Sequence, residues 1–344
     1  MGAACTGNGD VEQAAPSTAG ADTTAQTVTI PVTTTDVDGG GVVSECARTG
    51  VESTGNLQHP DLTEASGLAL GTGSGDDDGD DGVTVWAVND SGNAAGLYAV
   101  GSDGTDRGFF PLVDGAGAAV ENRDVEDLAI HDGVLHVADI GDNNAVRETV
   151  TIHLVPEPTV TGAAARDATV ARTLTITYQT GPVDAEAFLV DPLTGQLVIQ
   201  DKDLSTTETT IFTVDPPFSD QPMEAVVAGT FDLAEQESVH RELVAAALIF
   251  PAAVTAADIT PDGTLIAVRT YGTVWLFPRS AGQSVAEALT NTPCESGGAR
   301  EGQGESLAFL GDRTTDASGV TEVRFLTVSE GQFRPVNITT VELG

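Results

Sequence analysis

The run Glu126-Asp127-Leu128-Ala129 decides the fold, because it opens a unit that returns along the whole chain. A polar turn follows it, and then a second apolar strand over Val134–Ala138, a third over Val150–Val155 and an outer strand over Arg172–Tyr178. Short apolar strands separated by turn residues indicate one antiparallel sheet. We expect this sheet to be one of several.

The same unit occurs five times, with starts 48 to 71 residues apart. The first strands begin at Ser66-Gly67-Leu68-Ala69, Glu126-Asp127-Leu128-Ala129, Glu186-Ala187-Phe188-Leu189, Ala257-Asp258-Ile259-Thr260 and Glu305-Ser306-Leu307-Ala308. The second strands are expected over Val83–Val88, Val134–Ala138, Gln196–Gln200, Leu265–Arg269 and Val323–Val328, and the third over Gly96–Val100, Val150–Val155, Thr210–Val214, Thr273–Phe277 and Val336–Val341. Outer strands are expected over Phe109–Val113, Arg172–Tyr178 and Ala225–Phe231. A sandwich does not need one unit five times, so the repeats predict an all-β protein, a β-propeller of five blades.

The last repeat lacks an outer strand of its own, and Val42–Thr49 precedes the first repeat. We expect this N-terminal segment to complete the last blade and close the ring, so that residues 42–344 form a single domain. Asp232–Leu248 lies outside the repeat and leaves a sixth blade as the alternative.

The cysteines give two expectations about processing. Cys46 and Cys294 belong to no CxxC motif and no Cys/His cluster of the kind that binds zinc. A disulfide between them at the seam of the ring is therefore expected, with two unpaired buried thiols as the alternative. Cys5 follows small residues, as at the end of a lipoprotein signal, but no apolar stretch precedes it. Residues 1–40, rich in Thr, Ala and Gly, are then either a tether from a lipidated Cys5 or a disordered start without an anchor.

Charge excludes several partners. The chain has 14 Lys+Arg against 52 Asp+Glu, a net charge of −38, and Lys202 is its only lysine. Such a field repels nucleic acid and anionic lipid, so we expect no nucleic-acid partner and membrane contact only through a lipid anchor. The excess is either a solubility adaptation or an attraction for a cationic ligand. The run Asp76–Asp81 is expected to be a solvated loop.

In a propeller the first strands surround the axis, so their leading residues converge. Glu126, Glu186 and Glu305 would meet there with Asp258, while the first repeat contributes Ser66. These carboxylates either hold blades together, with Arg123, Arg147 and Arg269 as candidate partners, or bind Ca²⁺, or catalyse a reaction. Glu126, Glu186 and Glu305 are the catalytic candidates, and the same three with Asp258 are the metal candidates.

The turns after the second strands give a candidate binding face. They are rich in side-chain oxygens, and equivalent turns open on one side of the ring. The candidate residues are Asn89, Asp90, Asn93, Asp139, Asp142, Asn143, Arg147 and Arg269. Neither loop has the EF-hand spacing, and Asn and Asp also close turns without binding anything.

Several of these segments together resemble a group of exported actinobacterial β-propeller proteins with WD- or NHL-like repeats. They are Arg123-Asp124-Val125-Glu126-Asp127-Leu128-Ala129, Ala138-Asp139-Ile140-Gly141-Asp142-Asn143, Asp184-Ala185-Glu186-Ala187, Ala257-Asp258-Ile259-Thr260-Pro261-Asp262-Gly263 and Arg269-Thr270-Tyr271. The resemblance covers roughly residues 60–335. It implies the propeller fold and an extracellular or cell-surface location, and it implies no activity.

The leading hypothesis is a monomeric, exported binding module for an unknown extracellular ligand or protein, with Ca²⁺ as the one cofactor considered. The alternative is a propeller hydrolase, a glycosidase or a phytase-like phosphoesterase, that uses the axial carboxylates. Two tryptophans and three tyrosines offer few platforms for a sugar, and clustered cations that would grip phosphate are absent from the sequence. Binding is therefore favoured over catalysis.

Overall fold

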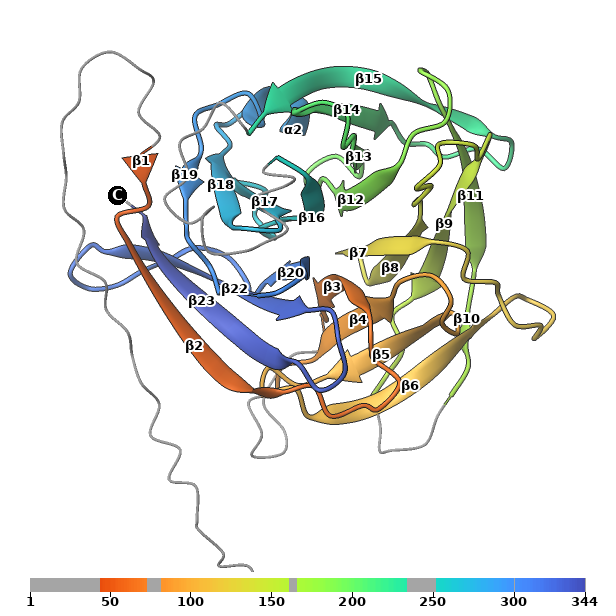
Figure 1. Ribbon diagram of the computed structural model, residues 1–344, viewed down its shortest axis with the longest axis horizontal. Helices are drawn as coiled ribbons and strands as arrows, with labels where there is room; N and C mark the ends of the chain where they lie inside the picture. Colours follow the sequence, from red (N-terminus) through yellow and green to blue (C-terminus); the bar gives the residue numbers. More distant parts are fainter. Residues whose placement is uncertain (1–43, 73–81, 161–165, 234–251, 300, 344) are drawn as a thin grey trace, which may run out of the picture.

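Five blades of β-sheet surround a common axis in the computed structural model of the chain (Figure 1). The structure describes residues 44–72, 82–160, 166–233, 252–299 and 301–343. The first strands of the five blades begin at Ala65, Val125, Ala185, Val254 and Gly304. They contact one another in that order, and the last contacts the first. The described part of the chain is thus a closed five-bladed β-propeller, as the repeats predict.

Each blade is an antiparallel sheet of four strands, numbered outward from the axis. Blade 1 contains β3 (Ala65–Leu70), β4 (Val85–Asn89), β5 (Gly96–Val100) and β6 (Asp106–Val113). Blade 2 contains β7 (Val125–His131), β8 (Val134–Asp139), β9 (Val150–Pro156) and β11 (Arg172–Tyr178). Blade 3 contains β12 (Ala185–Val190), β13 (Leu197–Asp201), β14 (Glu208–Val214) and β15 (Met223–Asp232). Blade 4 contains β16 (Val254–Ile259), β17 (Leu265–Thr270), β18 (Val274–Pro278) and β19 (Cys294–Glu295). Blade 5 contains β20 (Gly304–Phe309), β22 (Thr321–Ser329), β23 (Pro335–Leu343) and β2 (Arg48–Asn56).

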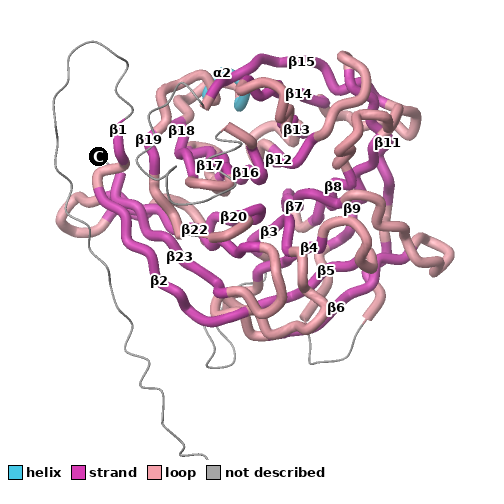
Figure 2. Tube along the Cα trace, in the orientation of Figure 1, coloured by secondary structure: helices cyan, strands magenta, loops and turns pink. Residues whose placement is uncertain are grey.

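Short additions extend the outer edges. Both β1 (Ser44–Glu45) on β19 and β10 (Ala168–Thr169) on β6 pair in parallel, and β11 pairs in parallel with β15 to join blades 2 and 3. β21 (Thr314–Thr315) pairs with β22. The helix α2 (Val285–Ala288), capped by Ser284, is the one helix among the described residues (Figure 2).

Apolar side chains lie between the blades, on both sides of each sheet. The buried residues fall into five clusters, and each cluster joins one pair of adjacent blades. Between blades 1 and 2, for example, the rings of Trp86 and Phe110 meet edge to face at 5.3 Å. Alternation along each strand sends one set of side chains to each neighbouring blade, which is why the repeats need one another.

The ring closes through strands from both ends of the chain, as expected, but the segment differs. The outer strand of blade 5 is β2, which pairs antiparallel with β23 from Arg48↔Glu342 to Asn56↔Pro335. The expected segment Val42–Thr49 reaches this strand only at its last two residues, and its Ser44–Glu45 pairs with blade 4 instead. Figure 1 shows β2 and β23 side by side.

The expected disulfide is confirmed. Cys46 lies between β1 and β2, and it is bonded to Cys294 of β19 with their Cα atoms 5.0 Å apart. Cys46 also donates its N–H to the carbonyl of Glu295 at 3.2 Å. The bridge therefore ties the segment that completes blade 5 to the outer edge of blade 4.

Three expectations fall wholly or mostly outside the described ranges: the tether with Cys5, the acidic run Asp76–Asp81, and the segment Asp232–Leu248 considered for a sixth blade, of which only Asp232 and Leu233 are described. Within those ranges, none of the helical structure has the length and apolarity that a bilayer crossing requires.

Candidate functional site

Every first strand carries a β-bulge at its leading end. The register with the second strand shifts across Ser66-Gly67 in blade 1 and at Glu126, Glu186, Thr255 and Glu305 in the other blades. A bulge leaves one residue out of the ladder and re-aims its side chain, often beside a functional site. Five bulged residues therefore meet around the axis, on the face where the first strands begin, which we call the leading face.

Blade 4 corrects the sequence alignment. Its bulged residue is Thr255, and the expected equivalents Ala257 and Asp258 lie farther along β16. The carboxylate of Asp258 accepts N–H bonds from Ile259 at 2.8 Å and from Phe309 at 2.7 Å, so it links blades 4 and 5. Asp258 is therefore a bond between blades, and it is separate from the glutamates at the bulges.

A second set of residues joins the bulges on the same face. In three blades the residue directly after the second strand donates its backbone N–H to the carbonyl of the residue two before the bulge, as in Asp90 to Glu64 and Lys202 to Asp184, both at 2.9 Å. In blade 2 the donor to the equivalent carbonyl is Gly141, the second residue after the strand. This set is Asp90, Gly141, Lys202, Tyr271 and Glu330. We call the two sets together, with Asp124, the axial cluster.

Lys202 supplies positive charge to the axial cluster. Its ammonium group forms an ion pair with Glu186, and both side chains are buried. Burial alone would lower the pKa of Lys202, but Glu186 and its other neighbours raise it above the ordinary value. Neither Arg147 nor Arg269, two candidate partners from the sequence, pairs with these glutamates: they pair with Asp139 and Glu301.

The remaining carboxylates outnumber this single cation. Burial, then Glu186, raises the pKa of Glu126 well above its ordinary range. Glu330 shares a side-chain hydrogen bond with Glu305, and burial and that neighbour raise the pKa of Glu330 to about 9. Crowded carboxyl groups that lack cations hold protons in this way. Positive charge brought by a ligand would stabilise their ionised forms.

Blades 1 and 2 provide the tightest carboxylate group. One oxygen from each of Asp90, Asp124 and Glu126 lies within 4.8 Å of the others. Burial raises the pKa of Asp90 to about 6, against the opposing N–H bond of Ser91. A Cβ at Gly141 would lie 2.2 Å from Oε1 of Glu126, so glycine leaves that oxygen its space. Three hard oxygen donors at this spacing suit a hard cation such as Ca²⁺.

A fully buried carboxylate lies deeper along the first strands. Asp127 accepts N–H bonds from Leu128 and Phe188, both at 2.8 Å, and from Ala257 at 3.3 Å. It thus connects blades 2, 3 and 4. Together with Asp258 it explains part of the acidic composition of the first strands as architecture.

The residues of the candidate binding face divide into two groups. Asn89 and Asp139 are buried and hold their loops: Nδ2 of Asn89 donates to the carbonyl of Asp61 at 2.6 Å, and Asp139 accepts from Nη2 of Arg147 at 2.6 Å. Arg269 is buried between blades 4 and 5. The Asp142 side chain accepts the N–H of Arg147. Asp90, Asn93, Asn143 and Arg147 of this set are half-buried or exposed, but the guanidinium group of Arg147 is occupied by its ion pair with Asp139.

The axial cluster also contains four residues that were not predicted from the sequence as site residues: Lys202, Tyr271, Glu330 and Asp124. Lys202, Tyr271 and Glu330 are of three different residue types, so a search for a sequence motif misses them. The signal that could have found Lys202, Tyr271 and Glu330 is position, since each directly follows a second strand. Asp124 stands two residues before a bulge, as Glu64 and Asp184 do.

Comparisons with known proteins find structural likeness alone. No family model and no curated protein sequence matches the chain. Hydrazine synthase from Kuenenia stuttgartiensis aligns with a TM-score of 0.35 at 13% identity, over 82% of this chain and 64% of that one. The calcium structure of the Trichoderma reesei carbohydrate-active enzyme of family AA12 gives 0.38 at 9% identity, over 88% and 98%. Hsv2 from Kluyveromyces lactis gives 0.30 at 8% identity, over 74% and 70%. Likeness at this level says nothing about ligand or activity.

Proposed function

We propose that this chain is an exported, ligand-binding propeller whose site is the axial cluster and whose ligand carries positive charge. The observation that carries the proposal is the convergence of Asp90, Asp124, Glu126, Glu305 and Glu330 from three blades around one buried lysine. Asp90, Asp124 and Glu330 are half-buried, so the cluster reaches solvent on the leading face. A rigid ring that presents such a group of charged side chains on one face suits recognition better than turnover.

Ca²⁺ is the smallest ligand of this kind, and Asp90, Asp124 and Glu126 are its proposed ligands. Binding to the folded state alone stabilises a protein by about 2.7 kcal/mol when the free ion is at a hundred times Kd. We expect the Tm to rise with added Ca²⁺ and to fall again with a chelator.

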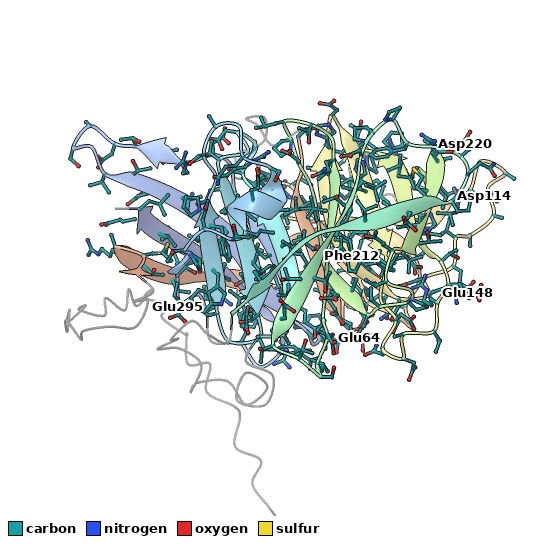
Figure 3. The ribbon with its side chains drawn as sticks, turned by 90° about the horizontal axis from the view of Figure 1, so that it is seen from above. Glu64, Asp114, Glu148, Phe212, Asp220 and Glu295 are labelled. Carbon is teal, nitrogen blue, oxygen red and sulfur yellow. A yellow bond between two sulfur atoms is a disulfide. The ribbon has the colours of Figure 1, made fainter. Side chains whose placement is uncertain are left out.

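Matched variants locate the effect. Asp124→Asn and Glu126→Gln each remove one carboxylate of the group and should abolish the Ca²⁺-dependent rise. Glu148→Gln makes the same change of charge at an exposed glutamate and should keep the Ca²⁺-dependent rise in Tm. Figure 3 shows Glu148 and Glu64 on the leading face and Asp220 on the opposite one. If the Tm of the unaltered protein does not respond to Ca²⁺, the proposed metal site is wrong.

A hydrolase is the second candidate, favoured by one specific observation. Burial and the neighbouring Glu305 raise the pKa of Glu330 to about 9, which favours its protonated form, and Glu186 forms an ion pair with Lys202 in the same cluster. Glycoside hydrolysis uses one protonated and one ionised carboxyl group, and phosphoesterases use metal-held carboxylates to activate water. Screens with aryl glycosides and aryl phosphates test this candidate: turnover must disappear in Glu330→Gln and in Glu186→Gln, and turnover that survives both substitutions excludes them from catalysis.

A further inference from the structure

The loops between second and third strands expose large apolar side chains on the leading face. Among the described residues six large apolar side chains are exposed, and three of them lie in these loops: Val146 at 70%, Leu204 at 47% and Phe333 at 46%. Each comes from a different blade, 2, 3 and 5. Single exposed apolar residues are ordinary, but three equivalent loops that each present one are a shared feature of this face.

The loop backbones hold two of these side chains outward. Ala145, directly before Val146, has φ +48°, and Phe333 itself has φ +54°. Non-glycine residues adopt this left-handed region rarely and at a cost in free energy. The backbone around Phe333 is also fixed, because Asn56 donates a hydrogen bond to its carbonyl at 2.9 Å. These tips are therefore set in place by the fold.

The three tips stand on opposite sides of the axial cluster. In a ring of five, blade 5 touches blades 4 and 1, so blades 2 and 3 lie across the axis from it (Figure 1). A segment that crosses the leading face from Phe333 toward Val146 and Leu204 passes over Asp90, Glu330 and their neighbours. Apolar contacts at both ends and negative charge in the middle describe one elongated surface.

We infer that the leading face binds an extended basic polypeptide segment, whose apolar side chains rest on Val146, Leu204 and Phe333 and whose basic side chain enters the axial cluster. This inference rests on the proposed function, because the axial cluster supplies the charge. Charge complementarity selects the occupant: a net charge of −38 disfavours a second copy of this chain, nucleic acid and anionic lipid alike.

The test uses the whole chain and a fluorescent synthetic peptide of about twelve residues, which reaches about 40 Å when extended. The peptide has a central Arg-Arg pair flanked by alternating Leu and Ser. One control peptide replaces each Leu by Ser, and another replaces both Arg by Gln. Binding is measured by fluorescence anisotropy in chelator, and then with Ca²⁺, which should compete for the same carboxylates.

Three variants separate the parts of the surface. The triple variant Val146→Ser/Leu204→Ser/Phe333→Ser should weaken binding of the Arg/Leu peptide at least tenfold. Leu193→Ser is the matched control, because Leu193 is 64% exposed in a turn between first and second strands, on the opposite face. The peptide without Leu should bind the unaltered protein as weakly as the triple variant binds the original peptide.

The outcomes distinguish the inference from the function on which it rests. Equal affinity of the triple variant and the unaltered protein overturns the inference, and so does a dimer in solution that the triple variant abolishes. A Ca²⁺-dependent Tm without peptide binding removes the inference and leaves the cation site standing. If neither ligand binds, both are wrong.

Discussion

Replacing the single lysine tests the electrostatics of the axial cluster most directly. In Lys202→Met the carboxyl group of Glu186 stays buried and loses its ion-pair partner. Removal of one member of a buried pair costs about 3–5 kcal/mol when the other stays charged. Glu186 can instead take up a proton. The free-energy cost of this protonation is then the ceiling, the largest loss of unfolding free energy that Lys202→Met can show.

The ceiling depends on pH. Holding a carboxyl with an ordinary pKa of 4.5 in its protonated form costs about 1.4 kcal/mol for each pH unit above that value. The ceiling is therefore about 4 kcal/mol near pH 7.5 and about 1.4 kcal/mol near pH 5.5. We expect Lys202→Met to lose about 3–4 kcal/mol of unfolding free energy at the higher pH and about 1 kcal/mol at the lower one.

Guanidinium unfolding at both pH values measures the loss. Arg48→Met is the matched control, because Arg48 forms an ion pair with Glu342 at 3.3 Å while its side chain is 60% exposed, and it should change stability little. Lys202→Met/Glu186→Gln should be more stable than Lys202→Met at the higher pH, since no buried charge remains. A loss of the same size at both pH values would refute the reasoning.

Burial raises the folded-state pKa of Glu330 to about 9 and of Asp258 to about 7, from ordinary values of 4.5 and 3.8, so the folded protein binds more protons than the unfolded one between roughly pH 4 and 9. Its stability in chelator should therefore be greatest at the acidic end of this window and fall as pH rises; a Tm that climbs from pH 5 to 9 contradicts this. Cys46→Ser/Cys294→Ser opens a loop with a sequence separation of 248 residues, for which chain entropy predicts a loss of about 5 kcal/mol, and guanidinium unfolding that finds no loss would show that pairing of the outer strands alone secures the seam. Asp127→Ala leaves three buried N–H groups without an acceptor and should cost about 3 kcal/mol or more, measured the same way; a loss below 1 kcal/mol would assign those amides other partners.

The fold could be predicted because its signals are local. Short apolar strands and turn residues recur in each unit, and the strands Gly96–Val100 and Arg172–Tyr178 have the bounds that the sequence predicts. The outer strand Arg48–Asn56 was displaced in the prediction, because its sequence RTGVESTGN lacks clear alternation. One side of an outer strand is largely exposed to solvent, so the alternation of apolar residues is a weak signal for such a strand.

The axial cluster could be predicted only in part. Glu126, Glu186 and Glu305 align by type, whereas Val254-Thr255-Ala256-Ala257 offers no acidic residue to fix the register. A slip of two residues keeps the same side chains on the same side of a strand, so alternation does not reveal it. Lys202 directly follows the second strand of blade 3, and its pairing with Glu186 depends on where that strand ends beside the bulge near the start of β12.

The seam made by β2 and β23 also sets an order of events during biosynthesis. Blades 1 to 4 each take their four strands from one stretch of chain, whereas blade 5 combines Arg48–Asn56, made before blade 1, with Pro335–Leu343, made after blade 4. Until Pro335–Leu343 has been made, the apolar sides of blades 1 and 4 that face blade 5 lack their neighbour and are exposed. Such exposed apolar surface makes the incomplete ring prone to aggregation during synthesis, so blade 5 has to close soon after its last strand is made.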